Sequence, residues 1–485
     1  LLSKDYLKLR FIFEEICPGM IYVADADMFA APLASLDLAG VEIVVSQDGA
    51  TEQSTTPFGD LLATSVTSDV DRALAQVGAE TVAKILYTSG STGQPKGVIN
   101  THGMLCANQQ MLAQIWPFTD KTPPVLVDWL PWNHTFGGNH NFNLVLKQGG
   151  TLYIDSGKPA PGLVEQTVKN LAEISPTIYF NVPVGYAMLL PHLEQDESLR
   201  NNFFKNLQLI FYAGAALPQD LWERLERVAI QATGKKVVMT SSWGSTETSP
   251  LATAAHFPLE KAGVIGIPCP GVSLKMIPNG DSYELRVKGP HVTPGYFRRP
   301  DLTAAAFDQD GFYLIGDAGR FVAHDDPSKG ISFDGRVAED FKLMSGTWVR
   351  VGLLRVAALA ALSPLLQFAL VTGHDREEVG LLGWPNIAAC MQLCDDLDEG
   401  VAPEVLLKHP AVVDFLRQAL IQFNSEQQGS STRIGRIMLM SEPPDSDAGE
   451  ITDKGYINQR AALQRRKTLV EQLYATPSGP GVIVL

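Results

Sequence analysis

A segment rich in glycine, hydroxyl groups and one lysine is the first part of the chain whose residues could do chemistry. It reads Tyr-Thr-Ser-Gly-Ser-Thr-Gly-Gln-Pro-Lys-Gly over residues 87–97 and begins at the end of the apolar run 85–87. Glycines let a backbone approach a polyanion and present N–H groups to it, hydroxyls add neutral donors, and Lys96 adds a mobile positive charge. These groups suit a nucleoside triphosphate. A flexible surface linker is the alternative, but a linker does not require a lysine placed after a strand.

The spacing around Lys96 differs from that of a Walker A loop, in which Gly-Lys is followed by Ser or Thr at the start of a helix. Pro95 precedes the lysine and Gly97 follows it. We therefore expect that no helix begins at Lys96 in the Walker manner. The residues predicted to hold phosphate are Thr88, Ser89, Gly90, Ser91, Thr92, Gly93 and Lys96.

Two acidic residues follow short apolar runs further along the chain. Glu247 lies in Ser-Trp-Gly-Ser-Thr-Glu-Thr-Ser (242–249) after an expected strand, where it could hold a magnesium ion that bridges phosphates. Asp317 follows the expected strand 311–315, and a carboxylate at a strand end can accept both hydroxyls of a ribose. Each has a simpler interpretation, which is a Ser or Thr helix cap for the first and a plain Gly-Asp turn for the second.

Two further groups of residues are less specific. Small residues at Gly214, Ala215 and Ala216 would let a flat ring lie against the backbone, but a glycine-containing turn before a helix explains them equally well. His134 could position a substrate, although a lone histidine is more often structural than catalytic.

The composition narrows the class of protein. With 485 residues, 45% hydrophobic and 19% charged, the chain suits a soluble globular enzyme of more than one domain. The net charge of −15 argues against non-specific nucleic-acid binding. Five scattered cysteines fit a reducing compartment, with Cys390 and Cys394 expected as buried thiols. The apolar stretch 351–371 contains Arg355 and a Ser-Pro pair, so we expect a cytoplasmic protein with no membrane span.

The order of the expected elements predicts an α/β fold with a largely parallel sheet. Apolar runs such as 85–88, 151–154 and 209–212 alternate with amphipathic helices through the first two-thirds of the chain. The later residues form short strands with turns, including an Asn279-Gly280 hairpin. The predicted units are an N-terminal domain over 1–335 with a β-rich subdomain over about 266–335, a mobile α+β domain over 336–475 and an irregular tail over 476–485.

Taken together, these segments resemble the adenylate-forming superfamily, which includes acyl-CoA synthetases, firefly luciferases and peptide-synthetase adenylation domains. Residues 87–97 resemble its signature loop and 242–249 its second signature, with Trp243 in place of the more usual tyrosine. By this resemblance the 1–335 unit is an adenylation domain. The resemblance also implies that nucleotide is bound by Gly214, Ala215, Ala216, Trp243, Gly244, Thr246, Glu247, Asp317 and Arg336, with Glu247 as the metal ligand.

The C-terminal motif of the superfamily is also present, with two departures. In the superfamily a lysine of this motif stabilises the charge that develops during adenylation. Here the aligned position holds Tyr456, and Lys454 is the local replacement. The domain hinge holds Ala338 where Asp or Lys is usual, and Lys342 is expected to serve the thioester-forming arrangement.

More specifically, the segments Trp-Gly-Ser-Thr-Glu-Thr, Gly-Arg-Val-Ala-Glu-Asp-Phe-Lys and Gly-Glu-Ile-Thr-Asp-Lys-Gly look like those of feruloyl-CoA synthetases, over nearly the whole chain. This implies an acid–thiol ligase that uses ATP, Mg²⁺ and coenzyme A, with a hydroxycinnamate such as ferulate as the acid. The implied catalytic residues are Lys454, His134, Glu247 and Thr92.

Two alternatives remain open. A related ligase could act on a fatty acid or another aryl acid, and a truncated chain could bind nucleotide without catalysis. The signature loop lies earlier in this chain than is usual in the superfamily, so we expect that the start of the N-terminal domain is missing. The expected partners are small molecules, and a homodimer is compatible with the resemblance.

Overall fold

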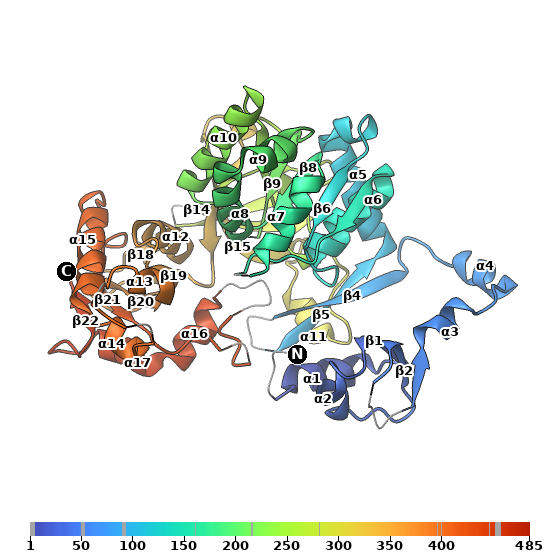
Figure 1. Cartoon of the computed structure of the whole chain (residues 1–485), viewed down its shortest axis with the longest axis horizontal. Helices are drawn as coiled ribbons and strands as arrows, with labels where there is room; N and C mark the ends of the chain where they lie inside the picture. The colour runs from blue at the N-terminus through green and yellow to red at the C-terminus, as the bar shows by residue number, and fades with distance from the viewer. Residues whose placement is uncertain are drawn as a thin grey trace.

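The computed structural model describes residues 5–49, 54–89, 94–160, 162–214, 217–280, 282–394, 396–398, 400–445, 447–451 and 457–485. A mixed nine-stranded sheet forms its centre (Figure 1), in the order β13-β14-β15-β16-β12-β11-β10-β9-β8. The strands β8 to β10 are parallel, and the rest of the sheet is antiparallel. Its strands are β8 (Ile178–Asn181), β9 (Leu209–Tyr212), β10 (Val238–Trp243), β11 (Thr253–Ala254), β12 (Val264–Pro268), β13 (Ser273–Asn279), β14 (Ser282–Lys288), β15 (Tyr313–Phe321) and β16 (Ile331–Arg336).

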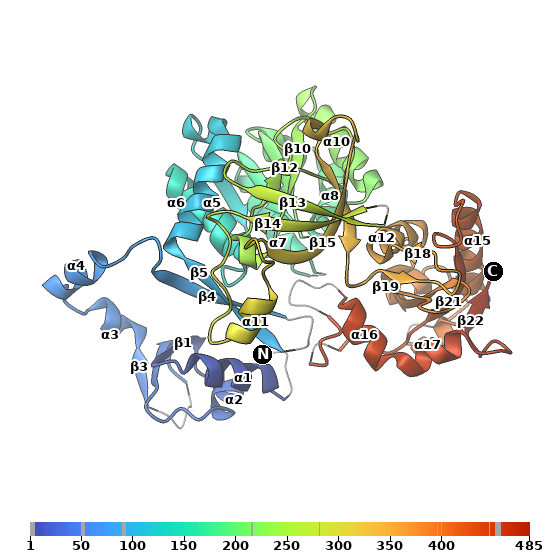
Figure 2. The same ribbon diagram turned by 180° about the vertical axis from the view of Figure 1, so that it is seen from behind.

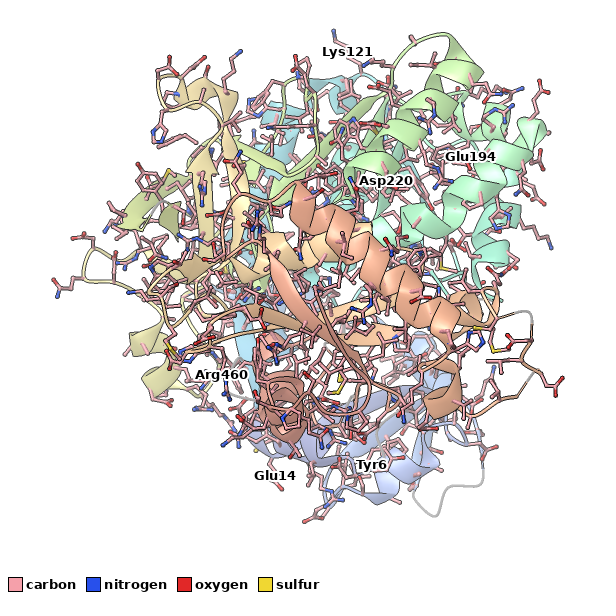
Figure 3. The ribbon with its side chains drawn as sticks, turned by 90° about the vertical axis from the view of Figure 1, so that its left-hand side faces the viewer. Tyr6, Glu14, Lys121, Glu194, Asp220 and Arg460 are labelled. Atoms are coloured by element: carbon pink, nitrogen blue, oxygen red, sulfur yellow. The ribbon has the colours of Figure 1, made fainter. Side chains whose placement is uncertain are left out.

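Helices cover both faces of the parallel strands, which confirms the α/β fold. Along β9, Ile210 and Tyr212 pack into one apolar core, whereas Leu209 and Phe211 pack into another on the opposite face. Strands buried on both faces have continuous apolar sequences, as this one does. Charged side chains such as Glu194 and Asp220 point outward from the covering helices (Figure 3). These helices are α7 (Val164–Glu173), α8 (Pro183–Gln195), α9 (Glu197–Phe204) and α10 (Gln219–Thr233) on the first face, and α5 (His102–Ile115) and α6 (Asn143–Gln148) on the second.

The predicted β-rich region continues the central sheet. The Asn279-Gly280 hairpin is confirmed, since β13 and β14 pair antiparallel with Asn279 opposite Ser282. These strands join the parallel ones through β12 and β11. The predicted boundary between residues 335 and 336 falls at the end of β16.

The segment that contains Lys96 lies in a hairpin of its own. The strands β4 (Val82–Ser89) and β5 (Pro95–Thr101) pair antiparallel, with Thr88 opposite Lys96. Lys96 thus lies in a strand, and no helix begins there. The expectation that the run 85–88 joins the parallel sheet is wrong, because β4 pairs with β5 instead.

The N-terminal residues pack beside this hairpin (Figure 2). The Tyr87 hydroxyl donates to Glu15 Oε2 at 2.5 Å, and Arg298 Nη1 donates to the Glu15 carbonyl at 2.8 Å. A parallel sheet of three strands follows, and a second parallel pair runs beside β8. The elements are α1 (Leu7–Ile16), β1 (Met20–Asp25), α2 (Ala30–Ala34), β2 (Glu42–Gln47), β3 (Thr55–Pro57), α3 (Phe58–Leu62), α4 (Ser68–Leu74), β6 (Val125–Asp128) and β7 (Thr151–Ile154).

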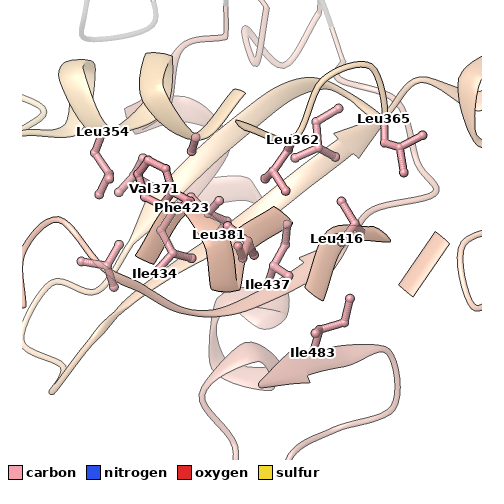
Figure 4. Packing of buried hydrophobic residues seen from close by; sticks show 14 of the residues in the cluster. Leu354, Leu362, Leu365, Val371, Leu381, Leu416, Phe423, Ile434, Ile437 and Ile483 are labelled. Atoms are coloured by element: carbon pink, nitrogen blue, oxygen red, sulfur yellow. The ribbon is translucent and has the colours of Figure 1, made fainter. Parts of the chain in front are cut away.

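The C-terminal part forms a second sheet with its own core (Figure 4). Leu381 and Ile437 of the sheet pack against Leu354 of α12 and Leu416 of α15. The sheet order is β19-β20-β21-β22. The elements are α11 (Pro300–Ala305), which precedes this part, and β17 (Phe341–Lys342), β18 (Trp348–Val349), α12 (Val351–Ala361), β19 (Leu366–Thr372), β20 (Val379–Pro385), α13 (Ile387–Met391), α14 (Pro403–Leu406), α15 (Pro410–Ser425), β21 (Ile434–Leu439), α16 (Gln459–Arg465), α17 (Lys467–Leu473) and β22 (Val482–Val484).

The prediction of an irregular tail over 476–485 is wrong, because this segment contains the strand β22. Ile483 is buried against the second sheet, and β22 pairs antiparallel with β21. The proline and glycines before it are typical of irregular chain, and a three-residue strand gives too short a pattern to stand out beside them. The apolar stretch 351–371 forms α12 and β19, and within the described ranges no helix is long and apolar enough to cross a membrane.

A buried ion pair holds the C-terminal part together and predicts a stability difference. Arg466 donates to both oxygens of Glu450, at 2.7 and 2.8 Å, and both side chains are almost fully buried. Glu450→Ala would leave the buried guanidinium with the exposed carboxylate of Glu442 as a partner, so we expect the free energy of unfolding to fall by about 3 kcal/mol, the lower end for breaking a buried pair. Urea titration followed by circular dichroism measures it.

The matched control is Glu471→Ala, which removes an exposed pair with Arg376. This variant should lose less than about 1 kcal/mol. Equal losses in the two variants would contradict the role given to the buried pair.

Candidate functional site

A sharp turn follows the end of β10. Gly244 has φ +158°, and a Cβ atom there would lie 1.8 Å from the Pro250 carbonyl oxygen, so only glycine fits. The Thr248 hydroxyl accepts from the Ser245 N–H at 2.8 Å and donates to the Pro250 carbonyl at 2.6 Å. The turn starts the short 3-10 helix η3 (Thr246–Thr248), and the Thr248 hydroxyl, rather than a capping side chain at Ser245, accepts from the backbone at the start of this helix.

Glu247 of η3 is a buried carboxylate with neutral hydrogen-bond partners. Its side chain is 8% exposed, and its Oε1 accepts from the Tyr296 hydroxyl at 3.0 Å. Burial and the neighbouring Glu247 raise the pKa of Tyr296 above its usual range, so this hydroxyl stays protonated and donates. Within the described part of the chain, no lysine or arginine forms an ion pair with this carboxylate. Its negative charge is thus left for a cation, and carboxylate oxygens are ligands that Mg²⁺ prefers.

Asp317 lies inside β15. The expectation that it follows the end of a strand is therefore wrong, and so is the alternative of a plain Gly-Asp turn. Trp243 Nε1 donates to Asp317 Oδ2 at 2.7 Å, and Arg336 Nε lies 3.1 Å from Oδ1. Asp317 raises the pKa of Arg336, so the guanidinium keeps its charge. The strand continues past Gly316 because its register with β16 shifts between Asp317 and Gly319. Such a bulge cannot be distinguished from a strand end in the sequence.

A loop after β14 connects the β4–β5 hairpin to Glu247. The Thr293 N–H donates to the Glu247 carbonyl at 2.8 Å, and the Thr293 hydroxyl donates to the Ile99 carbonyl of β5 at 2.7 Å. Lys96 Nζ lies 5.3 Å from the centroid of the Tyr296 ring. The loop therefore places Lys96 over the ring face of Tyr296 and Glu247 at the hydroxyl of the same side chain.

His134 stands at the start of a π-helix, η2 (Phe136–Phe142). Its Nδ1 accepts from the Phe136 N–H at 3.1 Å, so a neutral ring carries its proton on Nε2. The Asn139 amide donates to Asn100 of β5 at 2.8 Å and to Thr135 at 3.1 Å. This buried chain of side chains fixes the His134 turn relative to the hairpin. Neither amide was singled out from the sequence, where a lone Asn carries no signal.

The remaining expected residues lie elsewhere or are not described. Gly214 follows β9 with φ +89°. Lys342 lies in β17 with its Nζ 5.0 Å from the centroid of the Trp348 ring, and no contact joins it to the described residues around Glu247. The following predicted site residues lie outside the part of the chain that the structure describes: Gly90, Ser91, Thr92, Gly93, Ala215, Ala216, Lys454 and the side chain of Ser89.

Comparisons with known proteins identify the family and the fold. A family model described as AMP-binding enzyme matches residues 8–297. The probable CoA ligase CCL8 of Humulus lupulus is 28% identical over 361 residues, which cover 70% of this chain and 54% of that protein. A long-chain-fatty-acid–CoA ligase of Salmonella typhimurium is 29% identical over 265 residues, which cover 50% of this chain and 45% of that protein. The chain thus spans about half the length of the curated relatives it matches.

Solved structures share the fold. ATP-bound MatB from Rhodopseudomonas palustris aligns with a TM-score of 0.69 at 22% identity, covering 97% of this chain and 83% of that one. The anthranilate CoA ligase AuaEII in complex with anthranoyl-AMP aligns with a TM-score of 0.71 at 20% identity, covering 96% of this chain and 82% of that one. At such identities the likeness shows the fold alone.

A buried polar group beside η2 was missed by the sequence analysis. Asp128 accepts from the Asn141 amide at 2.9 Å, and Asn141 Oδ1 lies 2.9 Å from His140 Nδ1. Burial raises the pKa of Asp128 to about 6 and lowers that of His140 to about 4. Polar residues within an otherwise apolar segment were the available signal.

The Asp128 carboxyl predicts a pH dependence of stability. Since its pKa is raised in the folded state, its contribution is fully present below the ordinary pKa near 3.8 and is lost as the pH rises through about 6. Between pH 4 and 7 we expect wild type to lose about 2–3 kcal/mol of unfolding free energy relative to Asp128→Asn, at about 1.4 kcal/mol per pKa unit. Chemical unfolding at each pH measures the difference. Parallel curves for the two proteins would contradict the raised pKa.

Proposed function

Because the chain belongs to the AMP-binding enzyme family, we propose that it catalyses the ATP-dependent ligation of a carboxylic acid to coenzyme A. In the first step the carboxylate attacks the α-phosphorus of ATP, which gives an acyl-adenylate and pyrophosphate. In the second the thiol of coenzyme A attacks the acyl carbon and AMP leaves. Positioning and electrostatics carry such reactions, so no protein nucleophile is required.

The observation that carries this proposal is the pair of buried carboxylates with different partners. Glu247 has neutral hydroxyl donors and so retains the charge that a magnesium ion needs. When bound, this ion would offset the negative charge of the phosphates. Asp317 is fixed by Trp243 and Arg336, and a carboxylate held in this way would accept hydrogen bonds from the ribose hydroxyls.

The other proposed site residues would contact the phosphates, the substrate carboxylate and the adenine. Lys96 would contact the phosphates together with the hydroxyls and N–H groups of its loop, and Thr246 would donate to phosphate beside Glu247. His134 would position the carboxylate through its protonated Nε2. Gly214 and the two alanines after it would lie against adenine. The phosphate set is Thr88, Ser89, Gly90, Ser91, Thr92, Gly93 and Lys96.

The C-terminal part would contribute to both steps. Lys454 would supply positive charge during adenylation, and rotation near Ala338 would then bring Lys342 into the thioester-forming arrangement. Arg350 Nη1 donates to Asp340 at 2.8 Å and its Nη2 donates to the Asn279 carbonyl at 3.0 Å. This residue bridges the two parts close to the proposed hinge, so the rotation would break its bond to Asn279.

For the acid, we propose a hydroxycinnamate such as ferulate, on the likeness of three segments to feruloyl-CoA synthetases. A second candidate is a fatty acid, which is favoured by the identity to a long-chain-fatty-acid–CoA ligase. Another aryl acid is the third, since the fold is shared with an anthranilate CoA ligase. A chain that binds nucleotide without catalysis remains the candidate of a different class. Cytoplasmic location and a possible homodimer stay predictions.

The substrate prediction is tested with purified chain, ATP, Mg²⁺ and coenzyme A. We expect pyrophosphate and thioester absorbance with ferulate, and at least tenfold lower kcat/KM with palmitate, because a longer flexible chain needs a differently shaped pocket. Benzoate and anthranilate complete the panel. Turnover of palmitate but not ferulate would contradict the acid, and a folded chain without turnover would favour the non-catalytic candidate.

The lysine prediction separates the two half-reactions. Lys454→Ala should slow ATP–pyrophosphate exchange by roughly 10²–10³-fold, the usual effect of removing one group that stabilises developing charge. Thioester formation from supplied acyl-adenylate should change far less. Lys408→Ala removes an exposed lysine of the same region and should leave both rates unchanged. Exchange by Lys454→Ala at the wild-type rate would remove the proposed role.

A further inference from the structure

Tyr296 contacts two of the proposed ligand-binding groups, although no motif pointed to it. Its side chain is 7% exposed. The hydroxyl donates to Glu247 Oε1 at 3.0 Å, and the face of the ring carries Lys96 Nζ at 5.3 Å from its centroid. One side chain thus contacts both the proposed metal ligand and the proposed phosphate-binding lysine.

The backbone holds Tyr296 from two sides. It forms an antiparallel bridge with Val98 of β5, two residues after Lys96. Its N–H donates to the Thr303 hydroxyl of α11 at 2.9 Å. The preceding Gly295 has φ +147°, and a Cβ atom there would lie 2.4 Å from Thr303 Cγ2, so a larger residue does not fit. The ring is therefore fixed relative to the hairpin that carries Lys96.

Neutral and charged groups surround the contact between Tyr296 and Glu247. Tyr313 packs against the same carboxylate, and burial raises its pKa well above the ordinary value, so it is a second neutral hydroxyl. Arg336, which pairs with Asp317, is a further charged group near Glu247 and interacts with it electrostatically. Lys96 lies over the ring face, and Glu247 lies at the hydroxyl edge.

We propose that Tyr296 is a positioning residue that keeps Lys96 and Glu247 from forming an ion pair with each other. A direct pair would neutralise both the cation needed for phosphate and the anion needed for the metal ion. The ring face holds the Lys96 ammonium, while the hydroxyl orients Glu247 without cancelling its charge, so the two charged groups have separate contacts on one side chain. The inference rests on the proposed function, because it takes Glu247 as the metal ligand.

The test separates the hydroxyl from the ring. Tyr296→Phe keeps the ring over Lys96 and removes the bond to Glu247, so the half-saturating Mg²⁺ concentration in ATP–pyrophosphate exchange should rise roughly tenfold, as for loss of a hydrogen bond to a charged group. The KM for ATP at saturating Mg²⁺ should stay close to the wild-type value. Tyr296→Leu also removes the aromatic ring, so the half-saturating Mg²⁺ concentration and the KM for ATP should both rise. A Tyr296→Phe variant with the wild-type Mg²⁺ requirement would overturn the proposal.

Tyr186→Phe is the matched control. Its hydroxyl is equally buried and donates to the carbonyls of Tyr179 and Phe211, at 2.9 and 2.8 Å. This variant should lower thermal stability and leave the Mg²⁺ requirement unchanged. An equal shift in both variants would mean that the effect is structural and would overturn the positioning role.

Calorimetric titration of Mg²⁺ into the chain with a non-hydrolysable ATP analogue measures the affinity for Mg²⁺ without turnover. Glu247→Gln should weaken this binding more than Tyr296→Phe does. Unchanged binding in Glu247→Gln would overturn the proposed function at Glu247 and the inference with it. Weakened binding in Glu247→Gln together with wild-type binding in Tyr296→Phe would overturn the inference alone.

Discussion

The hydrogen bonds of Thr293 join the two parts of the candidate site. Its N–H donates to the Glu247 carbonyl, and its hydroxyl donates to the Ile99 carbonyl of β5. In the part of the chain that the structure describes, the β4–β5 hairpin pairs with no strand of the central sheet, so its position depends on side contacts such as this loop and the Val98–Tyr296 bridge. Without these contacts Lys96 would have no defined position relative to the carboxylates. The arrangement of the whole site follows from this link between a separate hairpin and the end of β10.

The two carboxylates of the site differ in how their charge is balanced. Asp317 lies against the guanidinium of Arg336 and accepts from the Trp243 indole, so its charge is balanced within the protein. Among the residues that the structure describes, Glu247 accepts from tyrosine hydroxyls and from no lysine or arginine, which is why we propose it as the ligand of a cation. We therefore propose that these two acidic residues, one in η3 and one in β15, take different ligands because their neighbours differ. Burial increases this difference, since a low dielectric strengthens every remaining interaction.

Much of the fold could be predicted because its elements are defined by local patterns. The run 209–212 forms β9 with the expected bounds, since a strand buried on both faces is apolar throughout. The Asn279-Gly280 hairpin likewise follows from turn chemistry. The pairing of 85–88, the bulge beside Asp317 and the strand at 482–484 could not be predicted. Each depends on which strand becomes the partner and in what register, and no local pattern in the segment itself identifies either.

The sequence by itself determined which groups are available: a lysine after a glycine-rich loop, a carboxylate after β10 and another before Arg336. These residue types define the possible chemistry, because charge and hydrogen-bonding capacity belong to the side chain. Only the tertiary structure decided which of these groups lie close together and which side chain connects them. Tyr296 is 200 residues from Lys96 and 49 from Glu247 in the chain, yet it contacts both. Such contacts depend on how the loop after β14 packs on β5, which is a property of the folded molecule and not of any local pattern.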